Sequence, residues 1–416
     1  MVLCFAVIMT SIVSSIIYII DNQEVLTMNK SVKSDGIHSM VPREKMTPST
    51  IKLRDFYALK PNAPFYHKTF GLWMCIDKWY EEEGLDRDAD LNELFMLDEP
   101  GFHPIAGLGW CEAAFEPVFE EKVLEDRGEH EVVQDFAGRS VLYFKGRRQG
   151  FMPEFIDHPV KDMKTWQDKC KWRLDSKTPE RYKDLPAQME IAKEKAAQGL
   201  MIQQMIIGGY MFLRSLMGPE DIMYVFYDNP ELVHDCMKTW LELSDAVIAK
   251  HQEYITFDEL YIAEDICYNH GPLISPDMMK EFLFPYYQQL ISNMKSRQID
   301  KSRKLYIQLD TDGDLRPVID VYKEGIDIDM LDPFEVASGC DVVEIGKDYP
   351  WLIMSGGIDK RMLSKDLNTL DRYLDGILPV MRQRGGFIPT CDHGVPPEVP
   401  WKNFLHYRKR CVEIGG

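Results

Sequence analysis

The chain has 416 residues, with 67 acidic side chains against 48 Lys and Arg, and a formal net charge of −19. This acidic excess argues against a nucleic-acid backbone or an anionic membrane surface as the main partner. The nine cysteines include no Cys-x-x-Cys pair, so neither a disulfide framework nor a structural zinc module is indicated. A reducing, cytoplasmic location is therefore expected.

The first twenty residues are free of charge, mostly apolar and about long enough to cross a bilayer. No Lys or Arg precedes the apolar run and no small-residue cleavage site follows it, so a secretory signal is poorly supported. Two interpretations stay open: a membrane anchor at residues 1–20, or a leader created by a start codon assigned too early, with later methionines at Met28, Met40 and Met46. Residues 1–45 are expected to be this leader followed by a disordered segment.

Residues 46–199 are expected to form the N-terminal part of the fold. An aromatic-rich run at 65–71 predicts a first strand, and 72–83 predicts a helix that ends at Gly84. Alternating polar and apolar residues then predict an antiparallel excursion, and two helices follow it. The predicted strands of the excursion are 115–124, 131–136 and 140–144, and the helices are 160–173 and 186–198.

Residues 200–416 alternate short apolar strands with longer helices, which predicts parallel strands joined by right-handed crossovers. Acidic residues and one histidine come at or just after the strand ends, and in a β/α barrel these ends open on one face. We therefore expect an α/β fold of the (β/α)8 TIM type with an N-terminal extension and a β-hairpin excursion; an open doubly wound sheet is the alternative. The predicted strands are 200–207, 259–263, 305–309, 326–330, 351–354 and 386–390. The predicted helices are 210–217, 220–227, 230–250, 275–296, 315–324 and 366–384.

The strand at 305–309 leads into Asp310, Asp312 and Asp314, and Gly313 interrupts the run. Asp310 and Asp312 are two residues apart, so in an extended chain both carboxylates leave the same side. Such a pair can hold a metal, move a proton or bind a cationic substrate. The alternative is a local turn, because Asp and Gly also end strands for purely local reasons.

Four motifs in this order resemble the uroporphyrinogen decarboxylase family, over roughly residue 202 to the C-terminus. The resemblance implies a β/α barrel of about eight strands. The family includes true decarboxylases and zinc-dependent methyltransferases that move a methyl group from a corrinoid protein to a thiol. The motifs are Gly-Pro-Leu-Ile-Ser-Pro at 271–276, Asp-x-Asp-Gly-Asp-x-Arg-Pro at 310–317, Ser-Gly-Gly-Ile-Asp at 355–359 and His-Gly-Val-Pro-Pro at 393–397.

The chain departs from both branches. The Arg-Gln-x-Gly-Arg segment with which the decarboxylases grip substrate carboxylates has no counterpart at the N-terminus; the similar string at Arg148 is far from that location. Where the methyltransferases carry zinc-binding His and Cys, this chain carries Asp310, Asp312 and His393. The resemblance implies a three-ligand metal site in which zinc is expected first, and carboxylate ligands also suit manganese or iron. Cys391 is interpreted as part of the wall of this site and not as a metal ligand.

Other residues near strand ends have alternative roles. Glu264, Asp265 and His270 are candidate acid/base residues. Glu264 or Asp265 can instead support a ligand such as His393, and His270 can be structural. Arg316, Tyr210 and Asp359 are candidates for substrate binding, although Tyr210 equally suits the core and Arg316 a helix surface.

The resemblance implies a barrel enzyme that transfers a methyl group between a corrinoid protein, or free cobamide, and a thiol or similar small-molecule acceptor. The first alternative is a cofactor-free carboxy-lyase of the uroporphyrinogen decarboxylase type, in porphyrin biosynthesis, whose pocket should be dominated by arginines. The second alternative is a non-catalytic protein that binds a corrinoid or tetrapyrrole.

Overall fold

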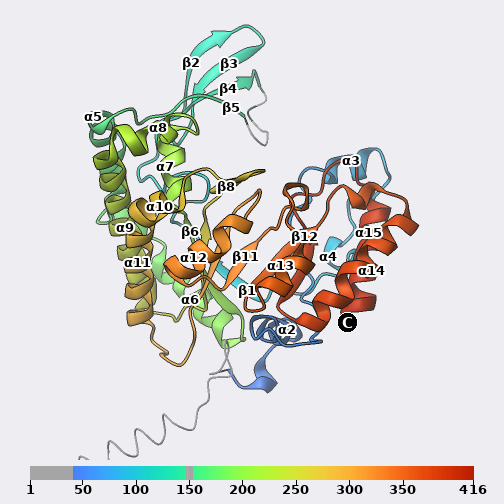
Figure 1. The fold of residues 1–416 in the computed structure, drawn as a ribbon. Helices are drawn as coiled ribbons and strands as arrows, with labels where there is room; N and C mark the ends of the chain where they lie inside the picture. The colour runs from blue at the N-terminus through green and yellow to red at the C-terminus, as the bar shows by residue number, and fades with distance from the viewer. Residues whose placement is uncertain (1–40, 147, 149–152) are drawn as a thin grey trace, which may run out of the picture.

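The computed structural model describes residues 41–146, 148 and 153–416. Seven parallel strands form a curled sheet in the order β1-β6-β7-β10-β11-β12-β13, with helices around its outer side (Figure 1). This confirms the α/β barrel expected from the alternation of strands and helices. The strands are β1 (Phe102–Ile105), β6 (Met201–Ile207), β7 (Glu259–Ala263), β10 (Tyr306–Asp310), β11 (Met330–Asp332), β12 (Ile353–Ile358) and β13 (Phe387–Cys391).

Helices connect consecutive strands and bury their apolar sides against the sheet. The longest, α9, precedes β7 and packs against α11, which precedes β10. The helices of this layer are α6 (Leu185–Ala197), α7 (Gly209–Met217), α8 (Asp221–Asp228), α9 (Pro230–Gln252), α10 (Pro276–Met278), α11 (Phe284–Arg297), α12 (Ile319–Ile326), α13 (Val342–Asp348), α14 (Leu367–Arg384) and α15 (Trp401–Gly415). The sequence prediction missed α13 and α15.

Residues 65–71 have no regular secondary structure and do not form the predicted first strand of the sheet. They run between β13 and β1, since the Phe65 ring lies 6.0 Å from that of Phe387 and the Tyr66 ring 5.9 Å from that of Phe102. The strand was predicted because aromatic residues favour the extended conformation. The prediction was wrong, because side-chain packing closes the barrel here in place of a ladder.

Helix α2 (Pro48–Tyr57) covers the N-terminal end of the barrel. Its Leu53, Phe56 and Tyr57 pack with apolar side chains from the first residues of the strands, which form a layer inside the barrel. The Tyr57 hydroxyl also donates to the carboxylate of Glu259, which is fully buried. This end of the barrel is therefore filled, and a ligand can enter only from the other end. The strand residues of this layer are Met201, Tyr306, Met330, Ile353 and Ile388.

The predicted excursion is a four-stranded antiparallel sheet in the order β2-β3-β4-β5, set apart from the barrel near α5 (Met163–Thr165), α7 and α8 (Figure 1). The strand predicted at 115–124 begins later than expected, because residues 115–121 are irregular. The short strand β5 was not predicted, nor was the two-stranded hairpin β8 (Cys267–Tyr268) and β9 (Gly271–Pro272). The strands of the excursion are β2 (Lys122–Arg127), β3 (His130–Gln134), β4 (Ser140–Phe144) and β5 (Glu154–Asp157).

Several predicted boundaries shift. The helix expected at 72–83 is shorter, α3 (Ile76–Glu81), and is followed by α4 (Leu91–Leu94). The helix expected at 160–173 is present at 163–174 as consecutive α-, π- and 3-10-helical segments. The strand expected at 326–330 begins only at Met330 because α12 continues to Ile326. Across the described ranges, no helix combines the length and apolar character needed to span a bilayer. The predicted leader at 1–20 lies outside these ranges, and the division at residues 45 and 199 stays a prediction.

Candidate active site at the barrel mouth

The acidic residues predicted at the strand ends do meet at one end of the barrel. Asp310 and Asp332 are the last residues of the neighbouring strands β10 and β11 and are paired in register. The main-chain oxygen of Asp310 accepts hydrogen bonds from the N–H groups of Glu264 and Asp265, at 3.0 Å each. The C-terminal ends of β7, β10 and β11 therefore carry four acidic residues side by side, where barrel enzymes place their active sites.

Asp310 and Asp332 share too much negative charge for both to ionise easily. Burial raises the pKa of Asp310 well above its usual range, and the nearby carboxylates of Asp332 and Asp312 raise it further. The Tyr261 hydroxyl, also inside the barrel, donates to Asp310 and partly offsets this. Burial raises the pKa of Asp332 to about 6, against the opposing effects of Lys68 and a hydrogen bond from the Gln308 side chain. Protonation of one member of the pair therefore relieves the repulsion between the two carboxylates.

Asp265 is fixed by a cation. Its carboxylate lies 2.8 Å from the Arg214 guanidinium, and its backbone has φ of +41°, a conformation that a non-glycine residue adopts at a cost of about 1–3 kcal/mol. Burial raises the pKa of Asp265, while Arg214 opposes that change. The described contact of Asp265 is with Arg214, so its support of a ligand such as His393 and its acid/base role both stay predictions.

Glu264 points away from the barrel interior, into the layer of helices. Its carboxylate accepts hydrogen bonds from the hydroxyls of Tyr287 on α11 and Tyr322 on α12, at 2.5 and 3.0 Å. Burial raises its pKa to about 7. Gly208 must be glycine here, since a Cβ would lie 1.7 Å from the Glu264 carboxylate. The structure thus separates Glu264 from Asp310 and uses it to tie β7 to two helices.

Asp312 and His393 lie together at the mouth, and the Asp312 carboxylate also acts electrostatically on Asp310 and Asp332. The His393 Nε2 atom is 3.5 Å from Asp312 Oδ2, and this carboxylate raises the pKa of the imidazole. The rings of Phe70 and Trp73 lie 5.5 and 6.4 Å from the imidazole. The strand ends at Asp310, so the alternation expected to bring Asp312 to the same side does not continue.

The predicted metal ligands are not gathered as a metal ion would need them. Asp310 faces Tyr261, whereas Asp312 faces His393, and within residues 41–146, 148 and 153–416 no three His, Cys, Asp or Glu side chains form a group able to hold a metal ion. Burial raises the pKa of the Cys391 thiol to about 12, so this side chain is a neutral thiol in this structure. This arrangement of side chains does not fit a bound metal, and the three-ligand site stays a prediction.

The remaining predicted residues have other surroundings. His270 is exposed beside Tyr268 at the rim, and Arg316 pairs with its neighbour Asp314 at 2.8 Å. Tyr210 is fully buried in α7, and Asp359 is buried with the Arg361 guanidinium 2.8 Å away. None of these four side chains joins Asp310 and Asp332, so their predicted roles in catalysis or substrate binding gain no support.

Three residues of the mouth were not predicted. Tyr261 occupies an inward position of β7, which the alternation of that strand could have revealed. Lys68 comes from the segment that closes the barrel and acts electrostatically on Asp332 and Glu259. Trp110 stacks on Tyr261, with ring centres 5.4 Å apart and planes within 13°. Lys68 and Trp110 come from irregular segments, where the sequence has no periodic pattern to indicate their direction.

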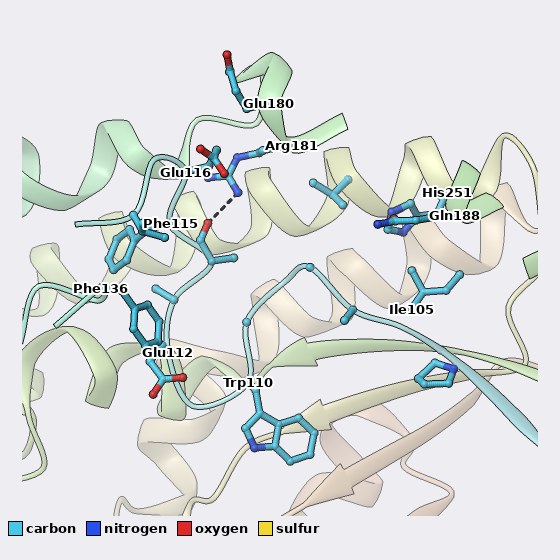
Figure 2. A pocket seen from close by; sticks show the side chains of 18 of the residues that line it. Ile105, Trp110, Glu112, Phe115, Glu116, Phe136, Glu180, Arg181, Gln188 and His251 are labelled. Carbon is cyan, nitrogen blue, oxygen red and sulfur yellow. Dashed lines mark hydrogen bonds between the residues drawn. The ribbon is translucent and has the colours of Figure 1, made fainter. Parts of the chain in front are cut away.

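A cavity of about 660 Å³ lies beside the mouth, between β1, the segment that follows it, α6 and α9 (Figure 2). Trp110 lines this cavity and also stacks on Tyr261, so it borders both spaces. The four acidic residues at the strand ends do not line the cavity. The cavity is therefore distinct from the predicted site.

Comparisons with known proteins agree with this architecture. The most informative solved structure is a methyltransferase from Methanosarcina mazei, 14% identical with a TM-score of 0.54, covering 88% of this chain and 98% of that one. A putative vitamin-B12-independent methionine synthase from Listeria monocytogenes is similar over 56% of this chain and 70% of its own, at 12% identity and a TM-score of 0.32. These likenesses concern the fold, and a search of curated proteins found no match. The family model for uroporphyrinogen decarboxylase (URO-D) matches residues 146–413, which is more than half of the sequence, so the chain belongs to this family.

Proposed function

We propose that this URO-D family protein catalyses methyl transfer together with a corrinoid protein, with a thiol or similar small molecule as the methyl acceptor. The observation that carries the proposal is the charge of the barrel mouth. Carboxyl groups of Asp265, Asp310, Asp312 and Asp332 surround it, and burial, with the repulsion of neighbouring carboxylates, raises the pKa of Asp265, Asp310 and Asp332. Such a site suits removal of a proton from an uncharged acceptor.

The negative charge of the barrel mouth disfavours the decarboxylase alternative, which predicted a pocket dominated by arginines. Arg214 is paired with Asp265 and Arg316 with Asp314, so neither guanidinium is available for a substrate carboxylate without giving up a partner. Lys360 at the end of the barrel is likewise paired, with Glu335 at 2.9 Å. A substrate with several carboxylates would meet an excess of negative charge at this mouth.

The corrinoid, when bound, would supply the methyl group. Asp332 is the residue placed to take the proton of the acceptor, because its pKa of about 6 leaves it ionised at neutral pH and strong enough as a base to act. The Asp332 carboxylate would accept the proton of the acceptor, which frees the lone pair of the acceptor atom for the methyl group that a bound corrinoid would supply. Asp310, protonated and held by Tyr261, donates a hydrogen bond to the acceptor.

The aromatic side chains around the mouth exclude water from the reacting groups. Trp110 is 42% exposed and Trp73 46%, although both contact other residues of the site. Exposed aromatic side chains of this size mark surfaces that bind another molecule. They support a mouth that a macrocycle or its carrier protein covers during the reaction.

The test is transfer of the methyl group from methylcobalamin to a small thiol, followed by the change in cobalamin absorbance. Replacing Asp332 by Asn should lower the rate roughly 100-fold or more, the usual contribution of a general base. Asp348→Asn, at an exposed position at the end of α13, is the matched control and should keep the rate. Release of CO₂ from uroporphyrinogen, without any methyl transfer, would contradict the proposal.

The metal content of the protein decides whether the predicted three-ligand metal site exists. Elemental analysis of protein purified without an affinity metal, beside the His393→Ala variant, should be combined with this assay. One metal per chain that is lost in the variant would show that Asp310, Asp312 and His393 rearrange to bind it. If the protein transfers methyl groups without metal, the carboxyl groups act alone.

A further inference from the structure

The cavity beside the barrel mouth is built mainly from apolar side chains. Its volume of about 660 Å³ is in the range typical of small-molecule sites, about 300–1,000 Å³. Four large apolar side chains in its lining are unusually exposed, Trp110, Val118, Phe136 and Ile191, at 42%, 53%, 42% and 49%. All four side chains line the same cavity, and Trp110 and Phe136 are labelled in Figure 2. A ligand in this cavity would cover part of their exposed apolar area.

The charged residues in the lining favour a ligand without negative charge. Glu112, Glu116 and Glu180 line the cavity, together with the single guanidinium of Arg181 (Figure 2). Arg181 gives three N–H donors to main-chain oxygens, including that of Ala114 at 2.8 Å. Glu112 is paired with an arginine outside the lining, at 3.0 Å. The guanidinium of Arg181 interacts electrostatically with Glu116, so Glu116 and Glu180 leave one negative charge in excess, which favours a cation over an anion.

His251 supplies a hydrogen-bond acceptor at the other end of the cavity. The Gln204 side-chain amide donates to two main-chain oxygens, so its Oε1 atom can only accept from His251 Nδ1, at 2.8 Å. The imidazole is therefore the tautomer with its proton on Nδ1, and burial lowers its pKa to about 4, which keeps it neutral. His251 is only 4% exposed, and within the described part of the chain its Nε2 has no partner. A ligand with an N–H donor can satisfy this acceptor.

We propose that this cavity binds a small-molecule amine with an apolar body. The apolar part would cover Trp110, Phe136 and Ile191, and the amine would donate to His251 Nε2 or to the carboxylates of Glu116 and Glu180. This site is separate from the proposed methyl transfer and does not depend on it. Because Trp110 also stacks on Tyr261, a bound amine would touch a side chain of the barrel mouth.

The test uses three probes of the same size that differ in charge: 1-naphthylmethylamine, 1-naphthalenemethanol and 1-naphthoate. Calorimetric titration into the full chain should give an affinity for the amine roughly tenfold or more above that for the carboxylate, the difference that one charge-assisted hydrogen bond makes. The alcohol should lie between them. Equal affinities for all three, or tightest binding of the carboxylate, would overturn the proposal.

A cavity-filling variant shows where the amine binds. Val247 on α9 is 7% exposed and lines the cavity, so Val247→Phe reduces the space without removing a polar group. The amine should then bind at least about fivefold more weakly, by loss of apolar contact. Val380→Phe, on the exposed side of α14, is the matched control and should leave binding unchanged. Unchanged binding in Val247→Phe places the amine elsewhere and overturns the proposal.

A second variant tests whether the carboxylates in the lining recognise the amine, and it keeps the packing of the protein. The double change Glu116→Gln and Glu180→Gln keeps the shape of the lining while removing two negative charges. The preference for the amine over the carboxylate should fall by roughly tenfold, whereas the affinity for the alcohol should stay the same. If the preference stays unchanged, these carboxylates do not recognise the ligand, and the assignment to an amine fails.

Discussion

Replacing Glu259 by Gln should stabilise the protein at neutral and alkaline pH. Glu259 is fully buried at the start of β7, where it accepts hydrogen bonds from Tyr57 and Gln203. The positive charge of Lys68 also attracts its carboxylate. Burial raises its pKa from 4.5 to about 7 in the folded protein, against the opposing effects of these partners. At about 1.4 kcal/mol per pKa unit, ionising this group in the folded state costs about 3 kcal/mol.

The direction of the pH dependence follows from which state, folded or unfolded, binds the proton of Glu259 more tightly. Because the folded state has the higher pKa, it binds the proton more tightly than the unfolded chain, so the contribution is fully present below pH 4.5 and is lost as pH rises to about 7. Glu259→Gln cannot ionise, so at pH 8 its free energy of unfolding should exceed that of the wild type by about 2 kcal/mol, after allowing about 1 kcal/mol for a poorer hydrogen bond. Near pH 4.5 this gain should disappear, and the variant should be less stable than the wild type by up to about 1 kcal/mol, because only the poorer hydrogen bond remains.

The assay is urea unfolding followed by tryptophan fluorescence at several pH values between 4.5 and 8, with metal chelated throughout. Glu82→Gln, at an exposed position after α3, is the control and should show no such pH dependence. A Glu259→Gln variant that is no more stable than the wild type at pH 8 would refute the reasoning. So would a gain of the same size at every pH, since it would show that ionisation of Glu259 is not the cause.

Two further substitutions test other contacts of the barrel. Asp312→Ala should lower the pKa of His393, because this carboxylate is what raises it; NMR titration of the imidazole would show no change if the two side chains do not interact. Tyr287→Phe should lower the free energy of unfolding by about 2 to 4 kcal/mol, because Glu264 keeps only the hydroxyl donor of Tyr322 and the main-chain N–H of Gly209 loses its acceptor. Tyr224→Phe, at a residue 69% exposed, should cost little in the same unfolding experiment, and equal losses in both variants would contradict this account.

The barrel could be predicted from the sequence because its C-terminal strands are short apolar runs that end in acidic residues. Glu259–Ala263 is predicted with its exact bounds, and the end of β10 at Asp310 is placed correctly. By contrast, β1 is four residues long and contains a proline, which weakens every strand signal. The segment at 65–71 has the residues of a strand, yet whether an extended segment gains a ladder depends on neighbours that the sequence does not reveal.

The site was predictable in its location and much less so in its detail. Spacing places Glu264 and Asp265 together at the end of β7, but adjacent side chains leave a strand on opposite sides, and only packing decides which one enters the barrel. Glu264 is held by Tyr287, from a helix distant in sequence, so local pattern carries no information about it. Trp110 and Lys68 could not be predicted at all, because each comes from a segment without regular structure.

Residues 65–71 close the barrel by side-chain packing, so the sheet is interrupted between β13 and β1. Across the described residues, β13 and β1 are joined by no strand ladder, so main-chain amides on these facing edges lack the protection that the other strands give one another. Amide hydrogen exchange should therefore be faster in the outer edges of β1 and β13 than in β7 and β10 at the centre of the sheet. If so, β1 and β13 separate from each other first when the protein unfolds. Lys68 then leaves the barrel interior before the acidic residues at the mouth separate.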